Sequence, residues 1–129
     1  MREILFRGKR FDNGEWETGP LLVERMNTSD QQVMIADKMT GYPTLVLPET
    51  VGQYTGLRDK NSTRIFEADI VKVYDVYCNE TVVGVVEFCD GSFRIYDKDF
   101  TSYDRWMYYK VEVIGNAYDN QELLEEDKT

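Results

Sequence analysis

The stretch QYTGLRDKNSTRIFEADIVKV, Gln53 to Val73, decides the fold class of this chain. It joins a glycine-centred segment, a charged turn and the run IVKV, in which apolar and polar residues alternate. Alternation with a period of two is typical of a β-strand that has one face in the core. Aspartates next to turns accept hydrogen bonds from nearby backbone amides. We therefore interpret the stretch as two turns that direct one strand into the core, with Asp59 and Asp69 capping backbone amides.

A β-hairpin at Asp90-Gly91 is the clearest prediction outside this stretch. A two-residue turn there gives one apolar face, and a shift by one residue would mix both faces. The predicted pairs are Phe88–Phe93, Glu87–Arg94, Val86–Ile95 and Val85–Tyr96.

A second two-residue turn is predicted at Asn13-Gly14, because both central residues of a type I′ hairpin turn need positive φ, which asparagine and glycine tolerate. This register gives one aromatic pair and one ion pair, on opposite faces. The predicted pairs are Phe11–Trp16 and Arg10–Glu17.

The rest of the chain repeats short extended runs between turns, which predicts a mainly β, antiparallel protein. Near the end, DNQELLEED favours a short C-terminal helix capped by Asn120 or Asp119. A length of 129 residues predicts one domain. Any boundary between subdomains is expected near residues 48–64.

Composition excludes several classes of protein. The chain has 24 acidic and 15 basic residues and a net charge of −9, which disfavours nucleic acid and anionic membranes as partners. It has no histidine, which removes the commonest general base and imidazole metal sites. Charged residues interrupt the first ten residues and no apolar run is long enough for a bilayer. We expect a cytoplasmic protein with no cofactor, in which Cys78 and Cys89 are reduced and not bonded to each other.

Clustered carboxylates are the remaining source of catalytic chemistry. Asp97, Asp99 and Asp104 form the densest group, and Glu67 and Asp69 form a second. Such groups can hold Mg²⁺ for chemistry on phosphodiesters, although the spacing lacks the glycine and final glutamate of a calcium loop. Exposed carboxylates in a solvated loop are the commoner explanation.

The segment RWMYYK gives the best binding signal, because aromatic residues stand between two cations. This pattern is found where single-stranded nucleic acid is held, and also on ordinary β-strands and protein interfaces. The candidate partner-binding residues are Arg105, Trp106, Tyr108 and Lys110.

Several linked motifs resemble the YopX protein family of bacteriophages and prophages. The opening MREILFRGKRFDNGEW, the central QYTGL…DKN…IFEADIV and the closing VEVIGNAYDNQELL match the family's order over nearly the whole chain. Tyr54, Gly56, Asp59 and Asp69 belong to this motif, and we assign them structural roles. The chain departs from the family at Ser62 and Ala68, where the family has glycine.

The resemblance implies a small, mostly β fold with an SH3-like barrel in the C-terminal half, residues 51–129, and an N-terminal β part, residues 1–50. It also implies a phage or prophage source and self-association, and it carries no established activity. We expect a non-enzymatic accessory protein, an oligomeric β binding module for a host or phage protein, with Trp16 or Trp106 near the interface. The alternative is a metal-dependent phosphodiesterase. At the two substituted glycines, we expect Ala68 at negative φ and the positive φ of Ser62 moved to Asn61.

Overall fold

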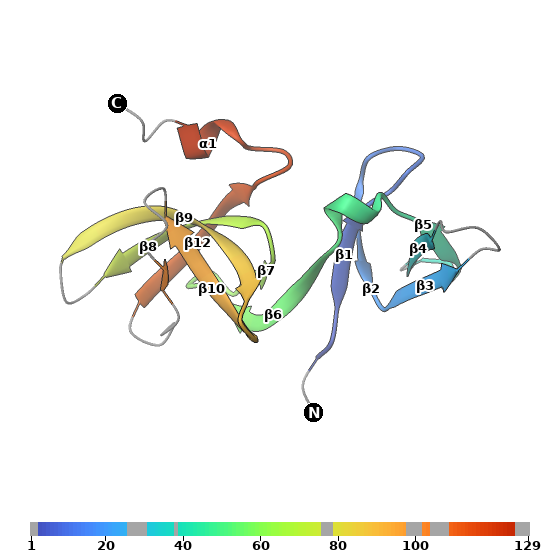
Figure 1. The fold of residues 1–129 in the computed structure, drawn as a ribbon, viewed down its shortest axis with the longest axis horizontal. Coiled ribbons are helices and arrows are strands. Elements are labelled where there is room, and N and C mark those ends of the chain that lie inside the picture. Colours follow the sequence, from blue (N-terminus) through green and yellow to red (C-terminus); the bar gives the residue numbers. More distant parts are fainter. Residues whose placement is uncertain are drawn as a thin grey trace. The chain divides into compact units, whose positions relative to one another are not determined.

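In the computed structural model of the chain, the described residues are 3–25, 31–37, 39–75, 79–97, 102–103 and 109–125. Nearly all regular structure is antiparallel β, which confirms the predicted fold class. The elements (Figure 1) are β1 Phe6–Lys9, β2 Trp16–Gly19, β3 Leu21–Arg25, β4 Gln31–Ala36, β5 Pro43–Leu45, the 3₁₀ turn η1 Pro48–Thr50, β6 Gly52–Arg58, β7 Arg64–Phe66, β8 Asp69–Asp75, β9 Glu80–Cys89, β10 Ser92–Asp97, β11 Ser102–Tyr103, β12 Tyr109–Asn116 and α1 Glu122–Glu125.

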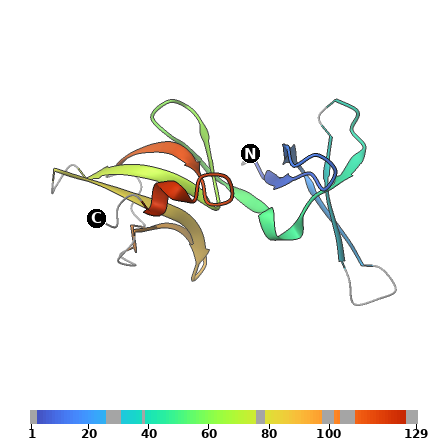
Figure 2. The same cartoon turned by 90° about the horizontal axis from the view of Figure 1, so that it is seen from above.

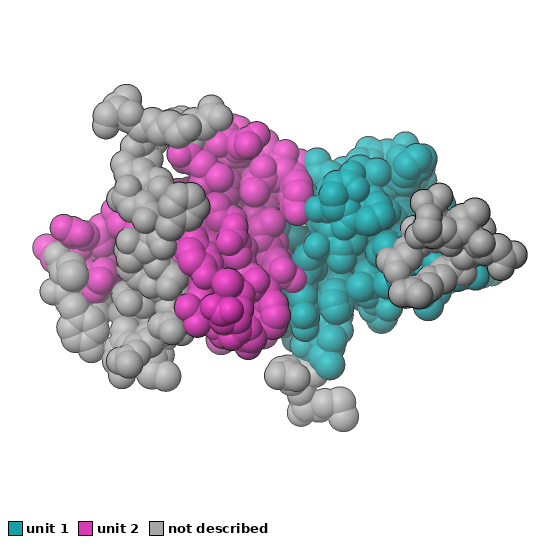
Figure 3. All heavy atoms as spheres, viewed as in Figure 1, with its two compact units in different colours: residues 1–54 teal, residues 55–129 magenta. Residues whose placement is uncertain are grey.

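The chain divides into two compact units, residues 1–54 and residues 55–129, coloured separately in Figure 3. The division lies within β6. The first residues of β6 pair with β1, and β6 is also hydrogen-bonded to β7.

The first unit contains the hairpin β1–β2 and a three-stranded sheet in the order β3-β4-β5. Val33 and Ile35 of β4 are buried together with Val46, which follows β5. Phe6, Leu21 and Val51 pack against these three residues. The alternation along β4 therefore sends Val33 and Ile35 to the core and Met34 to the opposite face.

The second unit is a five-stranded sheet in the order β11-β10-β9-β8-β12. The long strand β9, yellow in Figures 1 and 2, curves along its length. The core of the second unit consists of the buried residues Ile65, Val71, Val73, Val86, Ile95 and Val111. In the described residues the sheet order ends at β11 on one side and β12 on the other, so the SH3-like barrel stays a prediction.

The hairpin at Asp90-Gly91 has the predicted register. Phe88 lies opposite Phe93, Glu87 opposite Arg94, Val86 opposite Ile95 and Val85 opposite Tyr96. Asp90 and Gly91 have φ of 52° and 81°, as a type I′ turn requires. The two phenylalanine rings meet edge to face with centroids 5.0 Å apart. The apolar pattern therefore determined this register correctly.

The register predicted at Asn13-Gly14 is wrong by two residues. Trp16 lies opposite Lys9, and the turn is longer because the Arg10 amide donates to Glu15 O at 2.8 Å. Phe11 does not face Trp16; its amide donates to Leu45 O at 3.0 Å. A shift by two residues keeps every side chain on its face, so Arg10 still reaches Glu17, with 3.2 Å between Nη1 and Oε1.

Both expectations about the substituted glycines are also wrong. Ala68 has φ of 70°, and Ser62 itself has φ of 66°. The Ser62 amide donates to Asp59 O at 2.9 Å, which closes a four-residue turn with Asn61 at its third position. In three-residue loops built on such a turn, the fourth residue is the one in the left-handed conformation, so the strain stays at Ser62. Both positions keep the backbone shape that glycine would adopt freely.

The C-terminal helix is present and short, with residues Glu122–Glu125. Asn120 accepts the Leu123 amide through its backbone carbonyl at 2.9 Å. Its side-chain oxygen instead accepts the Asn116 amide at 3.2 Å, and Asp119 Oδ2 accepts the Asn116 side-chain amide at 3.2 Å. These two side chains therefore tie the helix entrance to the end of β12.

Candidate functional site

Asp59 is a buried carboxylate that joins the charged turn to the last strand of the second unit. Its Oδ1 accepts the amides of Asn61 at 2.8 Å and Thr63 at 2.9 Å. Its Oδ2 accepts the Val113 amide at 2.9 Å, and the Lys60 amide donates to Val111 O at 3.0 Å. The turn therefore covers the outer edge of β12, which would otherwise present unpaired backbone groups.

Burial alone would raise the pKa of the Asp59 carboxyl. The amides of Val113, Thr63 and Asn61 stabilise its charged form more strongly, and the positive charge of Lys60 adds to them. The pKa of Asp59 is therefore held below its usual range, and the group is a carboxylate at neutral pH.

The other residues of the central motif also make backbone hydrogen bonds or take a special backbone conformation. Asp69 Oδ2 accepts the Phe66 amide at 2.8 Å and closes the turn between β7 and β8. Tyr54 is buried, and its amide donates to Leu5 O at 2.8 Å. Gly56 has φ of 89°, a conformation that favours glycine. Asp59 and Asp69 thus accept backbone amides as the sequence analysis expected.

The structure describes only part of the RWMYYK segment. Arg105, Trp106 and Tyr108 lie outside the described residues, so their role in partner binding stays a prediction. Lys110 is exposed on β12, and its neighbour Val111 is buried. Lys110 Nζ lies 5.9 Å from the centre of the Tyr74 ring.

The carboxylates proposed for metal chemistry are only partly described. Asp99 and Asp104 lie outside the described residues, whereas Asp97 ends β10. Asp69 is 2% exposed and holds the Phe66 amide. Within the described ranges, no group of three or more acidic or cysteine side chains is arranged to hold a metal ion.

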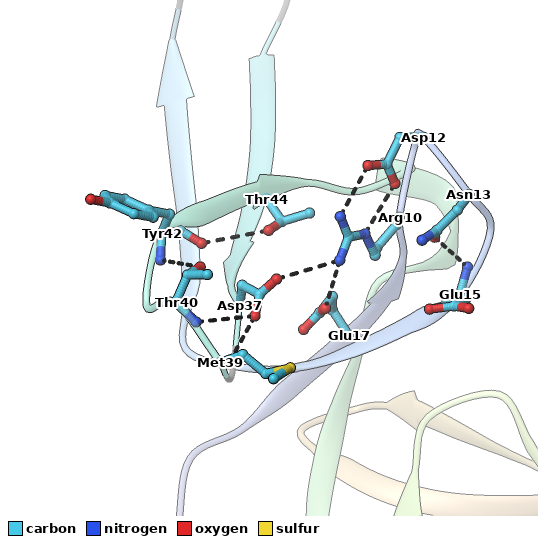
Figure 4. A network of polar contacts seen from close by, with 10 residues as sticks. All are labelled: Arg10, Asp12, Asn13, Glu15, Glu17, Asp37, Met39, Thr40, Tyr42 and Thr44. Carbon is cyan, nitrogen blue, oxygen red and sulfur yellow. Dashed lines mark hydrogen bonds and ion pairs between the residues drawn. The ribbon is translucent and has the colours of Figure 1, made fainter.

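Three carboxylates of the first unit surround one arginine (Figure 4). Arg10 binds both oxygens of Asp12 at 3.0 Å, and its Nη1 lies 3.2 Å from Glu17 and 3.4 Å from Asp37. The Arg10 guanidinium lowers the pKa of Asp12, and the amides of Met39 and Thr40 do the same for Asp37, with help from Arg10. This network joins the β1–β2 loop to the end of β4. The Arg10 guanidinium is the cation that these three carboxylates share.

The outer face of the three-stranded sheet carries an apolar row that the sequence analysis missed. Leu22 lies opposite Met34, and Met34 lies opposite Leu45, one residue from each strand. Leu22 is 50% exposed and Leu45 is 44% exposed. We call Leu22, Met34 and Leu45 the outer row. Ala36 and Pro43 form the next pair on the same face.

The sequence did contain a signal for the outer row. The runs LLVERM and VMIAD place apolar residues at both odd and even positions. A strand with one solvent face alternates, whereas a strand buried on both faces is apolar throughout. In the described residues, seven of the ten exposed large apolar side chains belong to the first unit.

Trp16 and Cys89 are the remaining residues that the sequence analysis singled out and that the structure describes. Arg7 lies 4.8 Å and Lys9 5.6 Å from the centre of the Trp16 ring, on one face of β1–β2. Cys89 is a free thiol, and Cys78 lies outside the described residues, so the predicted absence of a bond between them is untested. Among described residues, no helix has the length and apolar character of a membrane span.

Comparisons with known proteins identify the family. A family model described as YopX protein matches residues 5–125. The crystal structure of protein yopX from Bacillus subtilis is similar to this one with a TM-score of 0.58, 21% identity, and coverage of 96% of this chain and 99% of that chain. The crystal structure of protein EF1440 from Enterococcus faecalis is also similar, with a TM-score of 0.54 and 23% identity. The match covers 96% of this chain and 99% of that chain. No curated protein matched. At these identities the two structures show a shared fold, and because the family model covers nearly the whole sequence, the chain belongs to the YopX protein family.

Proposed function

We propose that this chain is a non-enzymatic accessory protein of a bacteriophage or prophage, acting in the bacterial cytoplasm as a self-associating β binding module. The observation that carries the proposal is the outer row, which leaves apolar side chains exposed on a sheet face whose other side is the core. The resemblance of the sequence motifs to phage proteins supports the source. A host or phage protein is then the partner of the assembled module.

A second copy of the chain is the occupant that best fits the outer row. One side chain from each of three adjacent strands forms the row, so the apolar surface is continuous across the sheet. Two such faces can pack against each other as the layers of a β-sandwich do, about 10 Å apart. A two-fold axis through Met34, on the central strand, would bring identical rows together, which is the commonest symmetry of homodimers.

The enzymatic alternative has less support. Asp69 is buried and binds a backbone amide, so it serves the turn between β7 and β8. Glu67 lies in the same turn and is half-buried. The Asp69 carboxylate is therefore already engaged by the backbone of this turn.

Sedimentation velocity of purified protein tests the proposal. We expect a concentration-dependent oligomer at micromolar concentration for the unmodified chain. The double variant Leu22→Lys, Leu45→Lys should sediment as a monomer, because each chain would have to bury two charges in the interface. Leu57→Lys is the matched control, since Leu57 is 41% exposed in the second unit and lies outside the outer row. It should remain oligomeric.

Two results would overturn this function. One is an unmodified chain that is monomeric over the whole micromolar range. The other is a double variant that keeps the oligomer of the unmodified chain while its circular dichroism spectrum shows a native fold.

A further inference from the structure

A pocket of about 280 Å³ lies on the second unit, on the face of the sheet away from its core. It is built mainly by three neighbouring strands, β9, β8 and β12. Its lining consists of Lys60, Lys72, Tyr74, Thr81, Lys110 and Glu112.

The register of the sheet brings these side chains together. Tyr74, on the central strand β8, lies opposite Lys110 on β12 and opposite Thr81 on β9. Lys72 lies opposite Glu112. Val71 and Val73, the alternate residues of β8, are fully buried, so Lys72 and Tyr74 point to the other face.

Lys60 reaches the pocket because of the turn that Asp59 holds. The backbone amide of Lys60 donates to Val111 O at 3.0 Å, which fixes the turn against β12. The Lys60 ammonium group then lies 3.5 Å from Glu112 Oε2. The two lysines of the stretch Gln53–Val73, Lys60 and Lys72, therefore both line this pocket.

The charges in the pocket do not cancel. Three ammonium groups face one carboxylate, and the only ion pair among the described lining residues joins Lys60 to Glu112. Lys110 lies over the Tyr74 ring, and Lys72 is exposed. This excess of two positive charges occurs in a chain with a net charge of −9. Like charges placed together without counterions repel each other, and an anionic ligand would relieve that repulsion.

We propose that this pocket binds the dianionic phosphate group of a small ligand, either inorganic phosphate or a phosphate monoester. A phosphate monoester carries nearly two negative charges at neutral pH, which matches the excess charge of the lining. Lysine binds phosphate as a point charge, and the Thr81 hydroxyl can donate a further hydrogen bond. The Tyr74 hydroxyl donates to Asn79 Oδ1, which holds the ring beside the pocket. The volume is near the lower limit for small-molecule sites, so the ligand is small.

Isothermal titration calorimetry of the whole chain tests this inference, with inorganic phosphate and adenosine 5′-monophosphate as the two probes. Sodium chloride at matched ionic strength is the reference. We expect saturable binding of at least one probe and weaker binding at high salt. Equal affinity for both probes would show that the phosphate group alone is recognised. Tighter binding of the monophosphate would show that the ester contributes.

Three single variants locate the binding. Lys72→Gln and Lys110→Gln should each weaken it by up to about fivefold, the upper end of the range measured for exposed charge pairs. Glu112→Gln should strengthen it, because the only carboxylate of the lining is neutralised. Lys9→Gln, in the first unit, removes the same charge elsewhere and should leave the affinity unchanged.

The opposite signs separate a binding site from a structural role, since a loss of folding would weaken binding in every variant. The inference is overturned if neither probe binds above the chloride reference. It is also overturned if Lys9→Gln weakens binding as much as Lys72→Gln, or if Glu112→Gln leaves the affinity of a folded protein unchanged. None of these results depends on self-association through the outer row.

Discussion

The Asp59 carboxylate accepts a hydrogen bond from the amide of Val113, 54 residues further along the chain. The same carboxylate holds the amides of Asn61 and Thr63 within its own turn. One side chain therefore shapes a local turn and ties that turn to the edge of the last strand. The stretch Gln53–Val73 is architecture in this sense, and the architecture also brings Lys60 to the basic pocket.

Replacement of Asp59 by asparagine should destabilise the protein by about 1–3 kcal/mol. An asparagine side chain has only one oxygen, so its amino group would face at least one backbone amide that needs an acceptor. Urea unfolding followed by circular dichroism measures the loss. Glu80→Gln is the control, because Glu80 is exposed at the start of β9. An Asp59→Asn variant as stable as the control would show that these hydrogen bonds contribute little.

The stability of the chain should fall in acid, partly through Asp59. Its pKa is lower in the folded protein than in the unfolded chain, where an aspartate has a pKa of about 3.9. The stabilisation is therefore complete above that value and is lost as pH falls through the folded pKa. Urea unfolding at a series of pH values should show a shallower acid dependence in Asp59→Asn than in the unmodified chain. Identical slopes would contradict the assignment.

Glycine should stabilise the protein at both left-handed positions. Ala68 and Ser62 have φ of 70° and 66°, where a side chain costs roughly 1 kcal/mol or more. Part of the gain is offset because glycine makes the unfolded chain more flexible. We expect Ala68→Gly and Ser62→Gly each to raise Tm, measured by differential scanning calorimetry. Thr81→Gly, near the start of strand β9, should lower it. A lower Tm in Ala68→Gly would mean that the methyl group contributes more by packing than it costs in strain.

The two hairpins show what the sequence could and could not predict. At Asp90-Gly91 the apolar pairs of β9 and β10 fill one face, so local pattern and final register agree. At Asn13-Gly14 the chain leaves its hairpin partner early, because Arg10 bridges to Val46 and the Phe11 amide binds Leu45 O. Contacts with a distant strand decided that register, and the local sequence contains no information about them.

The candidate sites were also predictable only where they depend on local sequence. Capping by Asp59 and Asp69 follows from turn chemistry, whereas the partner at Val113 depends on the fold. Lys110 was singled out with the aromatic segment, but the pocket around it needs Lys60 and Lys72 from elsewhere in the chain. The sheet register brings these residues together, and composition alone indicated only an acidic protein.

The loss of stability caused by replacing Arg10 should depend on pH. Without the guanidinium, Asp12, Glu17 and Asp37 would lie together as three carboxylates with no shared cation. Loss of the guanidinium removes a contact that lowers the pKa of Asp12 and of Asp37, so protonation of these two carboxyls should relieve the repulsion at a less acidic pH than in the unmodified chain. Arg10→Gln should therefore have a lower Tm than the unmodified chain at neutral pH, and the gap should narrow in mild acid. Arg94→Gln, in the second unit, is the control. A gap that widens in acid would contradict this account of the network.

Cross-linking through Met34 tests most directly whether two copies of the chain meet through the outer row. The experiment uses Met34→Cys in a background that carries Cys78→Ser and Cys89→Ser, and a bifunctional maleimide that spans about 10 Å, the spacing of packed sheets. Leu57→Cys in the same background is the control. We predict that Met34→Cys gives a covalent dimer at micromolar concentration and that Leu57→Cys stays monomeric on a denaturing gel. An oligomer in solution whose Met34→Cys form gives no covalent dimer would contradict the proposed interface.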